Sequence, residues 1–272
     1  QTGNLTLKLK GVLSNDAGSK KGTIAAAQGV SDIRASSISN QGGAIYAHTT
    51  NIGTGSINNQ QGEISAIDNV KISASNLYNK SGTVFAQNGL DMALSGAIDS
   101  NQAGTIGASN AVSLQAASVN NAGGNVYSVN QSLALHSKGT VNNNDGYIGA
   151  KTNLSLTASS LDNQRLDATK KQANIVADNI NLVVAGNVRN SGDIYAHSLN
   201  TLKAGTLNNR EGNVAAADAL NVTVGGDINN HAGKLNAGKD ITLTAQNLDN
   251  TSGTIGSTDG NATINISRQC TN

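Results

Sequence analysis

The sequence predicts an all-β fold, a parallel β-helix of about twelve turns with about 20 residues and three short strands in each turn. A unit of about 20 residues recurs along the chain and reads L-x-N, then G-x-I-x-A, then L-x-L-x-A. Apolar and polar residues alternate within each unit, which is the period of strands and not of helices. One unit cannot bury its apolar positions alone, so the copies must stack on one another.

Each unit opens with an aliphatic residue that begins its first strand. Identical positions of successive units lie directly above one another if each strand pairs in parallel with its counterpart in the next turn. With strands about 4.8 Å apart, twelve turns predict a rod roughly 60 Å long. The opening residues are Leu13, Ile38, Ile57, Leu77, Ile98, Val119, Val141, Leu161, Val188, Leu207, Ile228 and Leu248.

A corner follows the first strand, marked by an asparagine two residues after the opening residue and by a glycine three residues later. Both residue types accept left-handed backbone angles, and stacked asparagine amides can hydrogen-bond from turn to turn. We therefore expect a ladder of Asn40, Asn59, Asn79, Asn121, Asn143, Asn163, Asn190, Asn209, Asn230 and Asn250. The corner glycines are Gly62, Gly82, Gly124, Gly146, Gly212, Gly233 and Gly253.

Two further strands complete each unit. Counted from the aliphatic residue of G-x-I-x-A, later apolar positions fall six, eight and ten residues on, so Ile64 is followed by Val70, Ile72 and Ala74. Insertions near 16–22 and 164–174 interrupt two units, and each carries a lysine pair. Insertions in a solenoid are pushed outside the stack, where they form solvated loops or take part in recognition. The lysines Lys20, Lys21, Lys170 and Lys171 are therefore candidate surface contacts.

Composition is uniform along the chain and favours a single domain over residues 1–272. The apolar fraction of 37% and the absence of Trp predict a thin, aliphatic core. A net charge of +1 argues against a nucleic-acid partner, and no apolar run is long enough for insertion into a membrane as a helix. Cys270 is the only cysteine, so no internal disulfide can form, and we expect an inert thiol.

The polar residues suggest no catalytic, metal or cofactor site. Catalysis on a β-helix needs carboxylates that converge on one groove, but the acidic residues are scattered, and the closest plausible pair, Asp218 and Asp240, occupies ordinary polar positions. His48 and His197 share a repeat position but lie about seven turns, roughly 35 Å, apart, so they cannot share a metal ion. We expect a protein without enzymatic activity.

Four aromatic residues occupy the place just after the strand Ile or Val, where alternation points them outward. An outward row of aromatic rings could stack on sugar rings or on a partner protein. The alternative is that these rings only cover neighbouring strand atoms. The four candidate contacts are Tyr46, Phe85, Tyr127 and Tyr195.

The pattern L-x-N-x-x-G-x-I-x-A followed by L-x-L-x-A resembles the repeats of filamentous haemagglutinin and related two-partner-secretion exoproteins. These include the stalks of contact-dependent growth-inhibition toxins. The resemblance implies a right-handed parallel β-helix within a very long protein, exported across a Gram-negative outer membrane by a β-barrel transporter. The Asn-Pro motifs of the secretion domain and the Val-Glu-Asn-Asn element that precedes toxin regions do not occur, so we expect an excerpt from the shaft.

The resemblance therefore implies a structural stalk segment, secreted or on the outer cell surface, that extends an adhesive or toxin-bearing tip. Its partners would be the transporter and a glycan or receptor on a host or target cell. A polysaccharide-acting or carbohydrate-binding β-helix is the alternative, and a self-assembling fibre subunit is a third. The parent protein can be an adhesin or a growth-inhibition toxin.

Overall fold

The computed structural model describes residues 3–18, 20–167, 169 and 173–272, and these form strands, turns and bends without a helix. The strands are β1 (Leu5–Lys8), β2 (Val12–Ser14), β3 (Thr23–Ser39), β4 (Ala44–Asn58), β5 (Glu63–Ala66), β6 (Val70–Ala74), β7 (Asn76–Tyr78), β8 (Thr83–Ala86), β9 (Leu90–Leu94), β10 (Ala97–Asp99), β11 (Thr105–Ala108), β12 (Val112–Ala116), β13 (Ser118–Asn120), β14 (Asn125–Ser128), β15 (Leu133–Ser137), β16 (Thr140–Asn142), β17 (Tyr147–Gly149), β18 (Asn153–Ala158), β19 (Ser160–Asn163), β20 (Asn174–Ala177), β21 (Asn179–Asn190), β22 (Asp193–Ala196), β23 (Leu199–Asn208), β24 (Asn213–Ala216), β25 (Ala219–Val224), β26 (Asp227–Asn229), β27 (Lys234–Ala237), β28 (Ile241–Asp249), β29 (Thr254–Ser257) and β30 (Ala262–Thr271).

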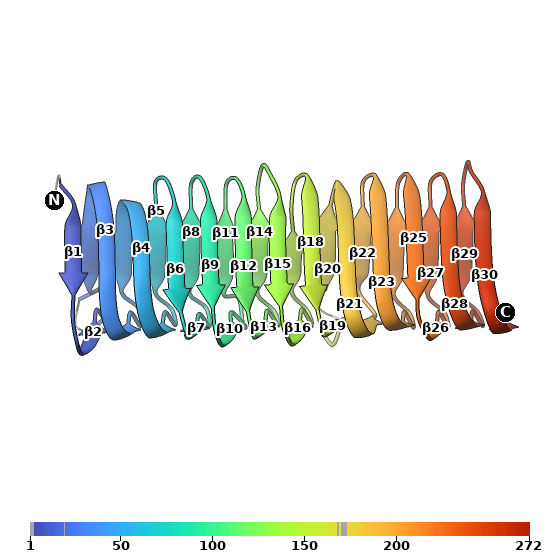
Figure 1. Ribbon diagram of the computed structural model, residues 1–272, viewed down its shortest axis with the longest axis horizontal. Helices are drawn as coiled ribbons and strands as arrows, with labels where there is room; N and C mark the ends of the chain where they lie inside the picture. The colour runs from blue at the N-terminus through green and yellow to red at the C-terminus, as the bar shows by residue number, and fades with distance from the viewer. Residues whose placement is uncertain (1–2, 19, 168, 170–172) are drawn as a thin grey trace. The chain divides into compact units, whose positions relative to one another are not determined.

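The chain divides into two compact units, Gln1–His136 and Ser137–Asn272, and each is a parallel β-helix. The expectation of one domain over residues 1–272 stays a prediction. Each turn has a first side that carries L-x-N, a second side that carries G-x-I-x-A and a third side that carries L-x-L-x-A. In Figure 1 the third-side strands β6, β9 and β12 run downward on the near side while the chain advances from left to right, so the coil is right-handed.

The register of the first side confirms the predicted repeat boundaries. In the first unit the opening aliphatic residues pair in one column, which is Leu13, Ile38, Ile57, Leu77, Ile98 and Val119. In the second unit the column is Val141, Leu161, Val188, Leu207, Ile228 and Leu248. Cys270 pairs with Leu248 and so occupies the same repeat position, on β30, where its thiol is exposed.

The core consists of stacked aliphatic columns, as predicted. On the second side of the first unit, Ile45, Ile64, Val84 and Ile106 pair in register and are each fully buried. Burial of one such side chain stabilises the fold by about 2 kcal/mol. No aromatic side chain is among the buried apolar residues of the described part of the chain. The aromatic rings are therefore left for the surface.

Several expected strands are continuous in the structure instead of short. β3 and β4 each run through all three sides of a turn, whereas β5, β6 and β7 divide the next turn as predicted. Within β3 the register against β4 shifts between Ala26 and Val30, so the chain bends there while it keeps pairing with its neighbour. Strands on adjacent turns thus impose hydrogen bonding even where the chain changes side.

The predicted asparagine ladder is present in both units and is buried. The Oδ1 atom of Asn59 accepts a hydrogen bond from Asn40 Nδ2 at 2.7 Å, and its own Nδ2 donates to Asn79 Oδ1 at 2.7 Å and to the carbonyl of Thr83 at 3.0 Å. In the second unit the same bonds, 2.7 to 2.8 Å long, join Asn143, Asn163, Asn190, Asn209, Asn230, Asn250 and Asn272. Each amide therefore ties its own corner to the next.

The ladder also contains residues that the sequence pattern did not single out. Asn15 donates to Asn40 Oδ1 at 2.6 Å, and Ser100 takes the ladder position in its turn, where its hydroxyl accepts from Asn79 at 3.1 Å. The corner from Ser100 to Gly104 is one residue longer than the corner from Asn59 to Gly62, and both Gln102 and Ala103 have positive φ. A shorter side chain thus accompanies a longer corner.

The predicted conformational role of the corner glycines and ladder asparagines is wrong. The left-handed residue is the one before the glycine, for example Gln61 with φ 56° and Glu211 with φ 58°. Gly62 is needed for space, because a Cβ atom there would lie 2.1 Å from the carbonyl oxygen of Asn40 and 2.7 Å from Asn59 Oδ1. The ladder of the preceding turn passes too close for any side chain.

The ladder predicts a large effect from one amide. Asn59→Ala leaves Asn79 Oδ1 without its buried donor and should lower the free energy of unfolding by about 3 kcal/mol, since an unsatisfied buried polar group costs about 1 to 3 kcal/mol. Asn59→Ser should lose less, because Ser100 already serves at this position. Urea unfolding measures both, with Asn88→Ala as the control, whose bonds to Asp68 and Asn110 are open to solvent. Equal losses for Asn59→Ala and Asn88→Ala would contradict a stabilising ladder.

The corner predicts opposite effects at adjacent positions. Gly62→Ala should destabilise the fold by about 2 to 3 kcal/mol through overpacking against the Asn40 carbonyl. Gln61→Gly should stabilise it by about 0.5 kcal/mol, because glycine adopts φ 56° without steric strain but gives up more chain entropy. Urea unfolding of the two variants decides the matter. An unchanged stability of Gly62→Ala would contradict the steric role of Gly62, and a loss of stability in Gln61→Gly would contradict the left-handed strain at Gln61.

Candidate functional site

The outward face of the second side in the first unit carries three of the four predicted aromatic contacts. Pairing of β4, β5, β8, β11 and β14 places them in one column, in the order Tyr46, Ser65, Phe85, Gly107 and Tyr127. The inward neighbours of these residues are buried, so alternation turns the column to the outside, where Tyr46 is 39% exposed. The structure therefore confirms the outward direction predicted for these three rings.

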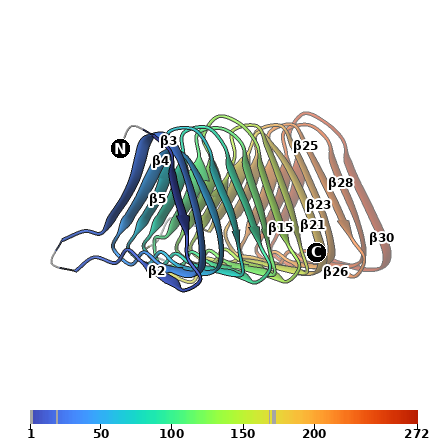
Figure 2. The same cartoon turned by 60° about the vertical axis from the view of Figure 1, so that its left-hand side comes forward.

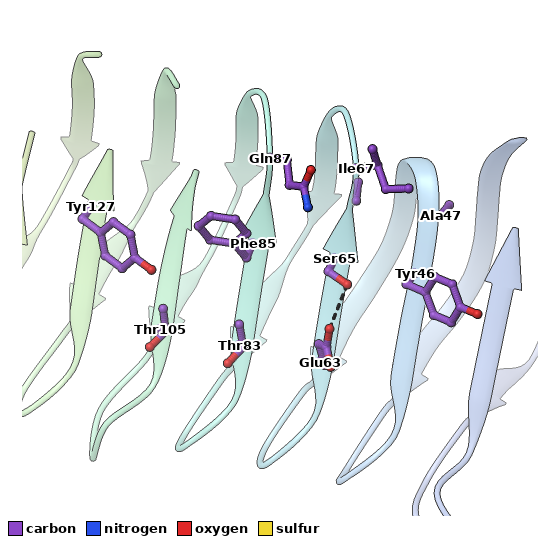
Figure 3. A pocket seen from close by; sticks show the side chains of 11 residues that line it. Tyr46, Ala47, Glu63, Ser65, Ile67, Thr83, Phe85, Gln87, Thr105 and Tyr127 are labelled. Atoms are coloured by element: carbon purple, nitrogen blue, oxygen red, sulfur yellow. Dashed lines mark hydrogen bonds between the residues drawn. The ribbon is translucent and has the colours of Figure 1, made fainter. Parts of the chain in front are cut away.

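An open groove of about 630 Å³ follows this column (Figure 3). In Figure 3 the rings of Phe85 and Tyr127 lie next to each other, and Tyr46 lies beyond Ser65 on the other side. We call this feature the aromatic groove, and the residues that define it are Tyr46, Glu63, Ser65, Phe85, Thr105 and Tyr127.

Gly107 explains why two of the rings meet. Phe85 and Tyr127 are two strands apart, yet their ring centroids are 6.3 Å apart with planes tilted by 43°. A Cβ atom on Gly107 would lie 3.1 Å from atoms of the Tyr127 ring and 2.9 Å from the Tyr127 carbonyl oxygen. The missing side chain lets the Tyr127 ring cover this strand, so the pair forms one continuous apolar platform.

Polar side chains border the platform in the adjacent column, which the sequence analysis missed. Glu63, Thr83 and Thr105 pair in register two residues before the aromatic column and point to the same outer face. Gln87 and Ile67, which is 51% exposed, line the opposite border. The signal was available, because positions two residues apart on a strand share a face.

The charge of Glu63 is compensated at the edge of the groove. Its carboxylate accepts a hydrogen bond from Ser65 Oγ at 3.0 Å and lies 3.6 Å from Lys21 Nζ. Lys21 belongs to the predicted insertion 16–22, which falls between β2 and β3, and the described residues of this insertion project from the stack as a blue loop in Figure 2. Of the two lysines predicted as contacts in this insertion, Lys21 lies beside the groove and Lys20 is exposed.

The base of this insertion is fixed by a carboxylate. Asp16 accepts hydrogen bonds from Ser39 Oγ at 2.6 Å and from the backbone N–H of Gln41 at 2.8 Å. Donation by Ser39 is the main cause that lowers the pKa of Asp16. The carboxylate stays ionised and anchors the chain just before Lys20 and Lys21.

Tyr195 lies in the second unit, in the column Val176, Tyr195 and Ala215. Its ring packs edge to face on His197, with centroids 5.1 Å apart. It lines a separate hollow of about 490 Å³ together with Arg165, Asp193 and Lys234, in which Arg165 pairs with Asp193 at 3.2 Å. Four charged side chains line this hollow, whereas Glu63 is the one charged side chain among the described residues that line the aromatic groove.

The second predicted insertion, near 164–174, falls between β19 and β20, and residues 168 and 170–172 within it lie outside the described part of the chain. The ladder closes its base, because Asn163 Nδ2 donates to the carbonyl of Ala173 at 3.0 Å, where other turns use the carbonyl of the corner glycine. Asp145 accepts the backbone N–H groups of Leu166 and Asp167 at 2.9 and 3.2 Å. The predicted contacts Lys170 and Lys171 lie outside the described residues.

Asp218, one of the two acidic residues considered for catalysis, is held in an ion pair and a hydrogen bond. Asp218 accepts hydrogen bonds from Lys239 Nζ at 2.7 Å and Ser198 Oγ at 2.8 Å, and the bond from Lys239 is the main cause that lowers its pKa. A general acid needs a raised pKa, so Asp218 is suited to pairing and not to proton donation. Within the described ranges, no group of three or more His, Cys, Asp or Glu side chains is placed to hold a metal ion.

The haemagglutinin repeat family matches residues 69–145, 130–192 and 193–268. The chain belongs to the haemagglutinin repeat family. This confirms the resemblance to filamentous haemagglutinin repeats, and it places Phe85, Thr105 and Tyr127 inside a matched segment. The haemagglutinin repeat family is a structural and adhesin family, typical of secreted or surface exoproteins.

Searches of curated proteins and of solved structures gave no match to this haemagglutinin repeat chain. Within the described ranges, no helix has the length and apolarity needed to cross a membrane.

Proposed function

We propose that this chain is a structural segment of the shaft of a two-partner-secretion exoprotein, which extends an adhesive or toxin-bearing tip from a Gram-negative cell. The observation that carries the proposal is the buried ladder of a haemagglutinin repeat chain, in which each amide bonds to the next turn at 2.6 to 2.8 Å over most of each unit. Such bonds resist both sliding and separation of the turns. The result is a stiff spacer.

The same architecture suits export through a β-barrel transporter, the proposed partner. Each turn contacts mainly its neighbours, so the fold can grow one turn at a time as the chain emerges. The core requires no disulfide, because the only cysteine is the exposed Cys270. We place the protein outside the cell, either secreted or at the outer surface, and both an adhesin and a growth-inhibition toxin could carry it.

A carbohydrate-binding role is the second candidate, and the aromatic groove favours it. A polysaccharide-acting enzyme is less well supported, because the carboxylate of Asp218 is held ionised by Lys239. The two roles are compatible, since a stalk can carry binding surfaces along its sides.

The stalk proposal predicts that whole turns can be removed. Deletion of residues 207–247 brings Leu248 into the place of Leu207, because Leu207, Ile228 and Leu248 share one column. We expect a folded protein whose maximum dimension in small-angle X-ray scattering is shorter by roughly 10 Å, the rise of two turns. Deletion of residues 207–217 is the matched control, because loss of half a turn destroys the register at that point and should lower the β-sheet circular dichroism signal. A maximum dimension unchanged by the two-turn deletion would contradict an extended spacer.

The proposed extracellular location predicts that an antibody reaches the protein on intact cells. An epitope inserted after the exposed Gly18, where the added chain meets open space, should leave the stack undisturbed. In the full-length protein on its native cell, we expect antibody staining of intact cells and of secreted material, both lost when the transporter is deleted. Staining that requires permeabilised cells, or that persists without the transporter, would remove the proposed export route.

A further inference from the structure

The aromatic groove has the form of a binding site that the stalk role does not require. A spacer needs buried columns and paired strands, but it gains little from the platform of Phe85 and Tyr127 or from Tyr46, which is 39% exposed. Along the same column, Ser65 and Gly107 leave room between and beneath the rings. The large and small residues therefore alternate so that the groove stays open.

We propose that the aromatic groove binds an uncharged oligosaccharide, which lies along the column with its sugar rings on the aromatic side chains. A pyranose ring presents C–H groups on its faces and hydroxyls at its edge, so it packs on an aromatic surface and hydrogen-bonds sideways. The platform of Phe85 and Tyr127 provides one such surface and Tyr46 a second. Ligand sites commonly combine apolar walls with a few placed polar groups.

The spacing of the two surfaces fits a chain of sugars and not a single ring. Tyr46 and Phe85 lie on strands separated by the strand of Ser65, so their Cα atoms are roughly 10 Å apart. Ser65 leaves the interval free of a large side chain. An oligosaccharide that covers both surfaces must therefore bridge this interval, and its middle residues lie over Ser65.

The polar border matches the edge of such a ligand. Thr83 and Thr105 point outward beside the rings, and Gln87 lines the other border. Hydroxyl and amide groups both donate and accept hydrogen bonds, as sugar hydroxyls do. These residues can follow a ligand along the groove from one turn to the next.

The charge of the groove and the pairing of its strands argue against two other ligands, an acidic oligosaccharide and a peptide. The carboxylate of Glu63 is compensated by Lys21, so the groove presents no net charge to attract a sulfated or carboxylated chain. Peptides commonly bind by adding a strand to an exposed sheet edge. Here β5, β8 and β11 are each paired on both edges, so a peptide finds no free edge among them.

The test is isothermal titration calorimetry of the chain with cellohexaose, chitohexaose and maltohexaose, and with a heparin hexasaccharide as the charged comparison. We expect at least one neutral hexasaccharide to bind. The double variant Phe85→Ser with Tyr127→Ser should weaken that binding about tenfold or more, because both rings of the platform are lost. Serine already occupies this column at Ser65, so the change is compatible with the fold, and circular dichroism checks this.

The matched control is Tyr78→Ser on the first side of the same unit. Tyr78 is 44% exposed, close to the 39% of Tyr46, and its replacement should leave binding unchanged. Absence of binding by all three neutral sugars would overturn the proposal, as would binding that survives the double variant or that is shown by heparin alone. None of these outcomes bears on the stalk role, which the scattering experiment tests separately.

Discussion

The buried asparagine ladder is the constraint on which the rest of the structure depends. Each amide accepts from the turn before and donates to the turn after, so a single side chain fixes both the spacing and the register of neighbouring turns, as at Asn59. Because the ladder runs inside the corner, the position three residues after Asn59 has no space for a side chain, and Gly62 is required there. The hydrogen-bond network and the glycine column are thus one feature.

Strict register also organises the surface. When every inward residue stacks on its counterpart, every outward residue does the same, so the outer face consists of columns whose members are about 4.8 Å apart. A binding surface can then arise from substitutions in one column, with no change to the core. The column from Tyr46 to Tyr127 is of this kind, since its inward neighbours Ile45 and Val126 remain fully buried.

The repeat pattern was sufficient to predict the fold, the register and the outward direction of the rings, because all three follow from which residues alternate and recur. It could not predict what depends on interatomic distances. The role of Gly62 was misassigned because the approach of the Asn40 carbonyl is a three-dimensional fact. The position of the Tyr127 ring over Gly107 was missed because it depends on side-chain torsions. The pairing of Lys21 with Glu63 was missed because it depends on the path of an insertion.

Both insertions fall in the same corner, between the ladder residue and the second side, and the ladder explains why this corner tolerates them. Asn163 closes an inserted loop by donating to Ala173, and Asn40 closes an uninterrupted corner by donating to Gly43, so the amide requires a carbonyl at the loop's end and not a fixed loop length. Chain added here leaves the stack without disturbing the register. It also emerges beside the outer face of the second side, as Lys21 does next to Glu63. Lengthening this corner is therefore a route by which a repeat scaffold acquires new chemistry at the aromatic groove while its core stays unchanged.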